Sequence, residues 1–172
     1  MNFSVRAQAA LVLFLFSFSL LPASALAARV QAIAYAVNPA TVSASANHSI
    51  LFQAKTEISS GTIKLYLSNL ISDTGSVGVT DIDFSYGAAP ASADQNQLAL
   101  AASAGNAIWG VAVDASTKIL TLTYPTVAAS ASIPASQYVK ISIGTHTYTG
   151  SAGASRFANA ASAGSKNISL TV

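Results

Sequence analysis

The sequence predicts an all-β fold in which two antiparallel sheets pack face to face as a sandwich. From residue 47 onward, apolar residues recur at every second position, which is the period of a strand rather than of a helix. Turn-forming residues such as Gly, Pro, Asn and Asp separate the apolar runs. Each run is apolar on one face only, whereas strands of a parallel sheet are apolar on both. We expect about seven to nine strands.

The alternation marks out seven strands in order along the chain. They cover residues 47–54, 61–68, 80–86, 108–114, 118–124, 138–143 and 167–172. In each strand one face is apolar and the other is largely polar, as expected for a strand that packs on a core. The fourth and fifth strands form the clearest hairpin, and Trp109 is predicted to be largely buried. An earlier run over residues 30–37 suits a strand but alternates less clearly.

Two segments, residues 87–106 and 145–166, are rich in Ala, Ser and Gly and do not follow the strand pattern. Loops of this length are uncommon in compact domains unless they hold structure or function. Within the first segment, residues 95–103 suit either a short helix or an edge strand. Within the second, residues 156–160 are predicted to form one helical turn anchored by Phe157.

Residues 1–27 have the three parts of a secretory signal peptide. Arg6 supplies the positive region, residues 10–21 form a short apolar run, and small residues follow. We expect cleavage after Ala27, at the second of two Ala-x-Ala sites. A membrane-spanning helix needs about 20 apolar residues, so no stable membrane span is expected. The prediction is a single β-sandwich domain over residues 28–172 that is secreted, either extracellular or at the cell surface.

Charged residues are scarce, at 8% of the chain against about 25% in typical proteins. After residue 27, seven scattered basic residues face six acidic ones, so the net charge is +1. No positive patch of the kind that binds nucleic acid is present in the sequence, and no nucleic-acid partner is expected. The chain has no Cys, which excludes disulfides. It has no P-loop, dinucleotide or zinc-protease motif either, and no cofactor is expected.

Three stretches resemble the immunoglobulin-like modules of secreted and surface-anchored bacterial proteins. Residues 42–52 look like the first core strand of such modules, and residues 138–144 and 164–172 look like their final strands. The resemblance implies an immunoglobulin-like sandwich with a structural, adhesive or spacer role at the bacterial cell surface or in extracellular assemblies. It implies no catalytic residues, so the chain is predicted not to be an enzyme.

Three acidic residues, Asp81, Asp83 and Asp114, are the candidates for a metal site. Asp81 and Asp83 are two apart and are expected on one face of a strand. Carboxylate oxygens are ligands that Ca²⁺ prefers, so a calcium-dependent binding module is one alternative function. The pair also suits the solvent-facing side of an amphipathic strand, which is the commoner case, or the acid and base of a glycosidase.

Three tyrosines, Tyr66, Tyr138 and Tyr148, are the candidates for ligand binding. Flat exposed rings on a β-sandwich are how carbohydrate-binding modules stack on sugars, so a glycan is the ligand under this alternative. The competing interpretation is that Tyr is common on strand exteriors because of its β-propensity.

A small secreted hydrolase is the third interpretation, and it depends on the two histidines. Spacing alone cannot exclude a Ser-His-Asp triad, because its members lie anywhere in a sequence. His48 alternates with Ile50 and Phe52, so we expect it on the inward face of a strand, as a residue of the core or its rim. His146 lies in a Thr-rich stretch and is expected at the surface.

Strand pairing with a second copy, or with another surface protein, is the predicted mode of association. The run at residues 30–37 and the strand at residues 167–172 are expected to leave backbone edges that another chain can pair with. The scarcity of charge removes one of the usual defences against pairing between edges.

The signal peptide gives the first testable prediction. After export, the chain should begin at Ala28, or at Leu26 as the second choice, because signal peptidase cuts after the small residue of an Ala-x-Ala site. Amino-terminal sequencing or intact-mass measurement of the exported protein checks this. Recovery of the chain in the membrane fraction with Met1 still in place would contradict it.

Overall fold

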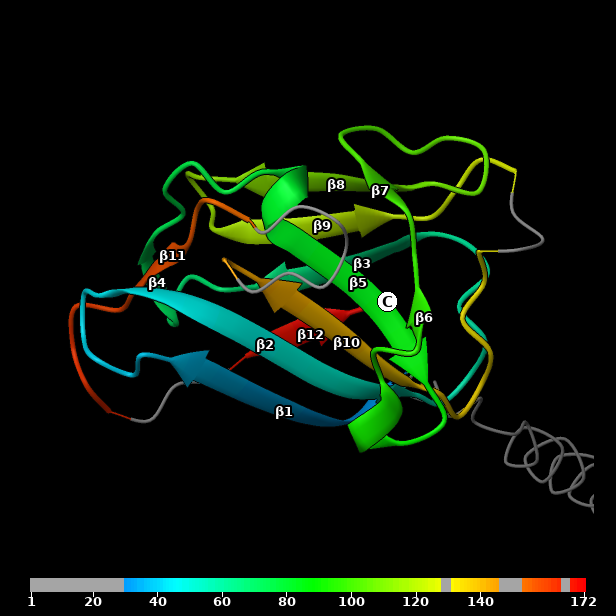
Figure 1. The fold of residues 1–172 in the computed structure, drawn as a ribbon, viewed down its shortest axis with the longest axis horizontal. Coiled ribbons are helices and arrows are strands. Elements are labelled where there is room, and N and C mark those ends of the chain that lie inside the picture. The colour runs from blue at the N-terminus through cyan, green and yellow to red at the C-terminus, as the bar shows by residue number, and fades with distance from the viewer. Residues whose placement is uncertain (1–29, 128–130, 146–152, 165–167) are drawn as a thin grey trace, which may run out of the picture.

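The structure, a computed structural model, describes residues 30–127, 131–145, 153–164 and 168–172. These residues form twelve strands in two sheets that lie face to face (Figure 1). Two single 3₁₀ turns, at Val79–Asp81 and Pro90–Ser92, are the helical elements of the described ranges. Within these ranges, no helix is both long enough and apolar enough to cross a membrane. The predicted all-β sandwich is confirmed, with more strands than the seven to nine expected.

The larger sheet is built around one strand, β2 (Ser45–Ala54). Along one edge it pairs with β1 (Val30–Asn38), and along the other with β10 (Tyr138–Ile143) and, at its start, β11 (Phe157–Asn159). Beyond β10 come β5 (Ile82–Gly87) and β6 (Asn96–Gln97), and beyond β11 comes β4 (Ile71–Asp73). All of these pairs are antiparallel.

The smaller sheet has five strands in the order β12, β3, β9, β8 and β7. Their bounds are β3 (Thr62–Tyr66), β7 (Leu100–Ala101), β8 (Trp109–Asp114), β9 (Ile119–Thr123) and β12 (Ser169–Thr171). The predicted hairpin is present as the antiparallel pair of β8 and β9. The two-residue strand β7 runs parallel to β8, so the sheet is not wholly antiparallel as expected.

The segments of small residues form short strands where the sequence was ambiguous. Residues 95–103 contain β6 and β7 at the sheet edges, which confirms the edge-strand alternative and excludes the helix. The helical turn predicted at residues 156–160 is wrong, because β11 occupies this place. Phe157 and Asn159 are both buried, and only the two-residue period of a strand turns both side chains inward.

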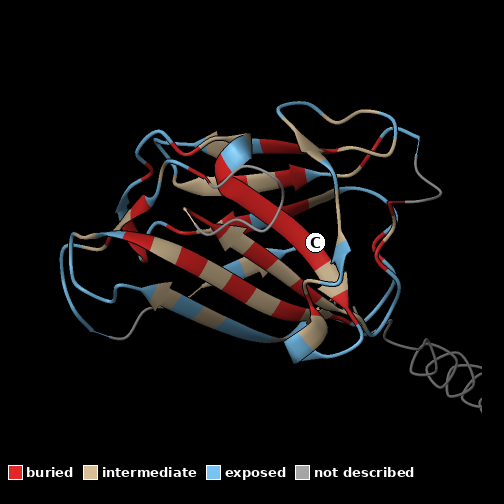
Figure 2. Cartoon of the chain, viewed as in Figure 1, coloured by how far each residue is buried: buried red, intermediate tan, exposed pale blue. Residues whose placement is uncertain are grey.

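Alternating burial builds the core between the two sheets. On β2, every second side chain is buried and those between are partly exposed, which Figure 2 shows as bands along the strand. The same alternation runs along β3, β9 and β10. On β5 nearly every residue is buried on both faces. A strand with such burial lies in the middle of a sheet and carries further structure over its outer face.

Trp109 lies at the centre of this core and is fully buried, as the sequence predicted. Its ring meets Phe84 and Tyr124 edge to face, with ring centroids 4.9 and 5.1 Å apart. Its indole Nε1 donates a hydrogen bond of 3.1 Å to the carbonyl oxygen of Ala131. The one polar atom of the side chain is therefore satisfied, as a buried Trp requires.

Replacing Trp109 with Ala should lower the free energy of unfolding by about 3–5 kcal/mol, because it leaves a large cavity and an unpaired Ala131 carbonyl. Urea denaturation of the variant and the parent measures this. Val127→Ala is the control, since Val127 is 64% exposed and its loss should cost less than about 0.5 kcal/mol. A loss below about 1 kcal/mol for Trp109→Ala would contradict the packing described here.

Candidate functional site

The candidate metal residue Asp81 holds a loop in place. It closes the 3₁₀ turn before β5, so the expectation that it shares a strand face with Asp83 is wrong. Its carboxylate accepts backbone N–H groups of Gly78, Ala154 and Ser155 at 2.9, 2.7 and 2.8 Å. Burial raises the pKa of the carboxyl, but these hydrogen bonds outweigh it and the pKa lies below its usual value.

The other two candidate carboxylates lie elsewhere. Asp83 is buried on β5, opposite Ser142 of β10, and is not the solvent-facing residue that the alternation suggested. Asp114 is exposed at the end of β8 and accepts hydrogen bonds from the Ser116 side chain and from the backbone of Ser116 and Thr117. The Ser116 hydroxyl contributes most to a pKa of Asp114 below its usual value. Across the described ranges, no three His, Asp or Glu residues gather as metal ligands would.

The candidate tyrosines are on different sheets. Tyr66 ends β3 and Tyr138 begins β10, and both are partly exposed. Each neighbours an inward residue, Leu65 and Val139 respectively, so each points away from the core on the outer face of its own sheet. The two rings therefore do not form one flat platform. Tyr148, like His146, lies outside the described residues.

His48 is buried on the inward face of β2, as predicted, and its contacts join three strands. Nδ1 shares a hydrogen bond of 2.5 Å with the hydroxyl of Tyr35 on β1. The imidazole also meets the ring of Phe157 on β11 edge to face, with centroids 5.6 Å apart. Its Nε2 is buried without a hydrogen bond of good geometry to any described residue. Loss of solvation lowers the pKa of His48 to about 4, and the Phe157 backbone opposes this only in part.

The strand beside His48, β1, is the longest open edge of the molecule. It pairs with β2 over residues 30–38, and no described strand pairs with its other side (Figure 1). No charged residue occurs in residues 30–54. An edge strand usually carries Lys, Pro or another device that prevents a foreign strand from adding to it. The nine residues of β1 contain neither Lys nor Pro, and the protective device in this strand is a bulge near its start, between Gln31 and Ile33.

The remaining edges of the described strands are shorter. β6 and β7 have two residues each, and β4 and β12 have three. β4 also contains Asp73, and Asp94 precedes β6. Shortness and charge are both ways in which proteins protect a sheet edge. Only β1 is long and uncharged among them.

The inward face of β1 is apolar and incompletely covered. Pairing with β2 aligns Ile33 with Phe52, Tyr35 with Ile50 and Val37 with His48, so all three side chains of β1 point inward. Tyr35 and Val37 are half-buried, whereas Ile33 is 39% exposed. Beside them runs an apolar groove of about 220 Å³, which is lined by Tyr35, Val37, Val42, Leu70, Ala160 and Ala163 among others. A neighbouring strand at this edge would cover surface that the domain alone leaves open.

The turn that leads from β1 into β2 is clamped by one side chain. The Asn159 amide donates hydrogen bonds of 2.8 Å to the carbonyl oxygens of Pro39 and Thr41. The backbone of the same segment adds bonds from Asn159 to Ala44 and from Ser43 to Ala160. Asn159 is itself buried. These bonds fix β1 against its own β2, and no described strand pairs with its outer backbone edge.

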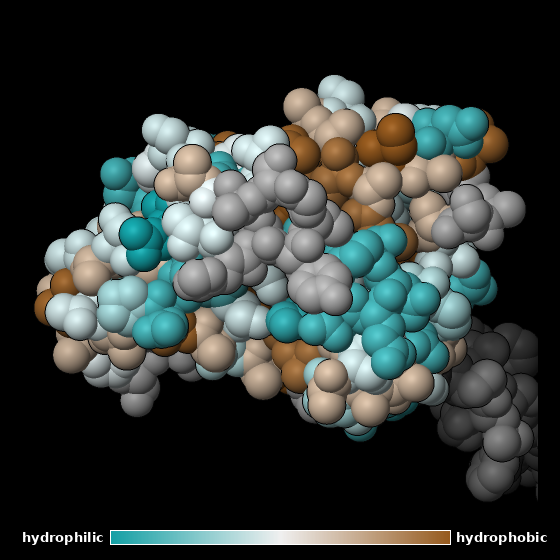
Figure 3. Space-filling view, viewed as in Figure 1, coloured by the Kyte–Doolittle hydropathy of each residue, from teal (hydrophilic) through white to brown (hydrophobic). Residues whose placement is uncertain are grey.

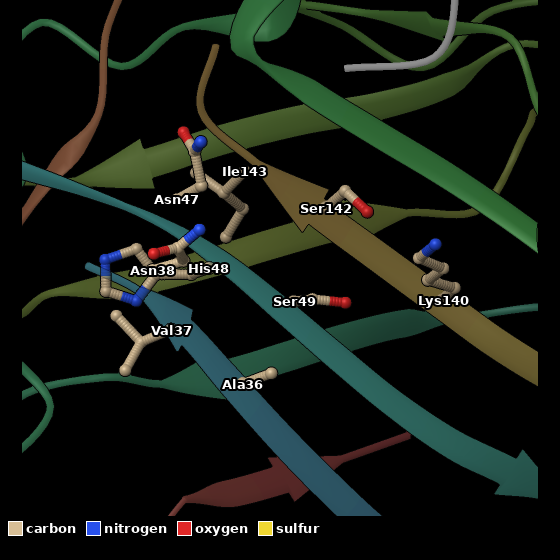
Figure 4. A pocket seen from close by; sticks show the side chains of 9 residues that line it. All are labelled: Ala36, Val37, Asn38, Asn47, His48, Ser49, Lys140, Ser142 and Ile143. Carbon is tan, nitrogen blue, oxygen red and sulfur yellow. The ribbon is translucent and has the colours of Figure 1, made fainter. Parts of the chain in front are cut away.

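A shallow hollow of about 270 Å³, lined by both polar and apolar residues, lies next to this edge, on the outer face of the larger sheet (Figure 4). Ala36, Ser49 and Ser142 stand in one row across β1, β2 and β10 and form its floor. Lys140 lies to one side, with its ammonium 4.0 Å from Asp94. Figure 3 shows hydrophilic residues over β6 and hydrophobic ones over β7 and β8.

Asn47 beside the hollow is fully used within the fold. Its Oδ1 accepts a 2.9 Å hydrogen bond from the Thr145 backbone and a 3.3 Å bond from the Thr145 hydroxyl. Gly144 lies against it with φ +130°, and a Cβ there would come within 2.1 Å of Oδ1. Only glycine fits this close approach.

Comparisons with protein-family models, curated proteins and solved structures find no match to the chain. The resemblance to immunoglobulin-like modules thus stays a prediction. The two packed sheets and the strand order within each are given by the structure itself.

The buried His48 makes stability depend on pH. The pKa is about 4 in the folded chain and 6.5 when unfolded, so the unfolded chain binds the proton first as the pH falls. The free energy of unfolding should therefore decrease from pH 6.5 downward, by at most about 3 kcal/mol at pH 4. Urea denaturation at several pH values measures this in the parent and in His48→Gln, which cannot titrate. Equal pH dependence of the two proteins would contradict the assignment, because carboxylate titration is common to both.

Proposed function

We propose that the chain acts outside the cell as a non-enzymatic structural subunit, which attaches to neighbouring protein through the edge of β1. The long, uncharged edge of β1, which pairs regularly with β2 from Ile33 to Asn38, carries this proposal. An exposed strand edge binds other chains by strand addition, in which backbone hydrogen bonds supply affinity and side-chain fit supplies selectivity. Soluble proteins that have no use for such an edge normally protect it.

The use of polar side chains in the described residues supports a structural role. Asp81 fastens residues 153–155, Asn159 fastens the turn after β1, and Asn47 fastens Thr145. All three of these side chains are engaged in holding a loop. Calcium or glycan binding has less support, because no three possible metal ligands gather among the described residues and the two described tyrosines lie on different sheets.

The amino-terminal segment and the composition support a place outside the cell. Residues 1–27 have the pattern of a secretory signal. Few surface charges, mostly replaced by Ala, Ser and Thr, suit a protein that packs against other protein or a matrix. The predicted setting is the bacterial cell surface or an extracellular assembly, in line with the modules that the sequence resembles.

Retention at the cell surface tests the proposal. The variant Ala34→Lys/Ala36→Lys places two charges on exposed residues of the β1 edge, and Ala112→Lys/Thr123→Lys places two on exposed residues of interior strands. In an exporting host, the parent and the interior variant should stay with the cell surface or matrix. The edge variant should be released, with its retained fraction about tenfold lower, which corresponds to about 1.4 kcal/mol. Equal retention of all three, or accumulation of the parent inside the cell, would contradict the proposal.

A further inference from the structure

We infer that the partner of the β1 edge is β1 of a second copy, paired antiparallel about a twofold axis so that the larger sheet continues from one molecule into the next. The inference rests on the proposed function and names the partner at the same edge. Antiparallel pairing of one strand with itself gives a symmetric interface in which each chain presents the same residues.

The backbone of β1 is suited to a strand as its partner. Alternate residues of an antiparallel edge strand direct both N–H and C=O away from the sheet. In the described residues, β2 pairs with one side of β1, and the other side faces no strand. A second extended backbone can replace water along this whole row of donors and acceptors at once.

The side chains of β1 are complementary to those of the same strand. Pairing about a twofold axis perpendicular to the sheet keeps inward residues next to inward residues and outward next to outward. Ile33, Tyr35 and Val37 of the two copies would lie together over the apolar groove, and Ala34 and Ala36 would meet on the opposite face. Aromatic and β-branched cross-strand pairs are among the favourable ones in sheets. A charged partner strand would find no opposite charge on β1.

The geometry favours addition of a strand over exchange of one. β1 is paired along its length with β2 in its own chain, and Tyr35 is bonded to the buried His48. The Asn159 clamp holds the turn that would have to open if β1 left for another molecule. A partner thus meets β1 in place, and two copies can pair without unfolding either one. Because each copy has one β1 edge, pairing through β1 closes at a dimer. The dimer carries two copies of every other surface, so loss of pairing weakens retention by removing bivalent attachment.

Light scattering over a concentration series tests the inference on the full chain, expressed with its own amino-terminal segment and purified without a tag near β1. The mass of the parent should rise toward twice that of the monomer, and so should that of Ala112→Lys/Thr123→Lys. Ala34→Lys/Ala36→Lys and Ala34→Glu/Ala36→Glu should each stay monomeric, because like charges then face each other across the axis. An equimolar mixture of these two should dimerise again, since opposite charges now meet. Circular dichroism confirms that each variant is folded.

Crosslinking gives a second measurement, because the chain has no Cys of its own. Directly opposite residues of an antiparallel pair are about 4.5–5.5 Å apart at Cα, within the range that a disulfide bridges. Ala34→Cys and Ala36→Cys, alone or mixed, should form disulfide-linked dimers under mild oxidation, whereas Ala112→Cys should not. The combination that links best gives the register of the pair.

Three results would overturn the inference. One is dimerisation of both charged edge variants to the same extent as the parent. Another is the absence of recovered dimer in the Lys and Glu mixture. The third is a parent that stays monomeric at all concentrations. If the parent is monomeric but Ala34→Lys/Ala36→Lys is still released from the cell surface, the partner is not a second copy, and the proposed function stands. If retention does not need the edge, the proposed function fails as well.

Discussion

The burial of the inward face of β2 is the constraint on which the rest of the structure depends. Ala46, His48, Ile50, Phe52 and Ala54 are all at most 3% exposed. One edge of β2 is occupied by β1 and the other by β10 and β11, so three separate parts of the chain are positioned by one strand. Because the side-chain period of a strand is two, a shift of one residue would turn this whole row outward. The register of β1, and hence the face that it shows, follows from β2.

Hydrogen bonds from buried side chains join distant parts of this chain, which has no Cys to form disulfides. Asp81 bonds to Ala154, Asn159 to Pro39, and Asn47 to Thr145, and each pair joins parts of the chain more than 70 residues apart. A buried polar group that loses its partner costs about 1–3 kcal/mol. A few such groups can therefore fix loops on a sandwich whose main stability comes from its apolar core. Asp81, a candidate metal ligand by sequence, is one of these residues, and its carboxylate binds backbone N–H groups of a loop.

The sequence predicted the long strands well, because each buries one face and alternates accordingly. The short strands β4 and β11 were missed, since two or three residues give no period to read. The weak pattern of β1 has a specific cause. A bulge between Gln31 and Ile33 shifts the register, so the inward positions change from even to odd numbers along the strand. Asp81 was misplaced because a 3₁₀ turn ends where the alternation suggested that the strand had begun.

The sequence indicated that the candidate site is a strand edge, but it did not indicate which strand forms that edge. Scarce charge and two weakly protected ends pointed to strand pairing, but the sequence does not say which strands lie at an edge, because strand order depends on contacts between distant segments. The structure puts β12 at an edge too, yet with three residues it offers few backbone groups. β1 combines length, neutrality and an apolar inward face.

The fold and the edge are linked energetically through Tyr35. This residue lies on β1, is bonded to the buried His48 and lines the apolar groove beside the open edge. A chain that pairs with β1 binds the folded state only, and any such binding stabilises the folded state by mass action. Acid acts in the opposite direction, since protonation of His48 places a charge in the core beneath the strand. The proposed association at the edge and the ionisation of His48 in the core would therefore both act on the pairing of β1 with β2.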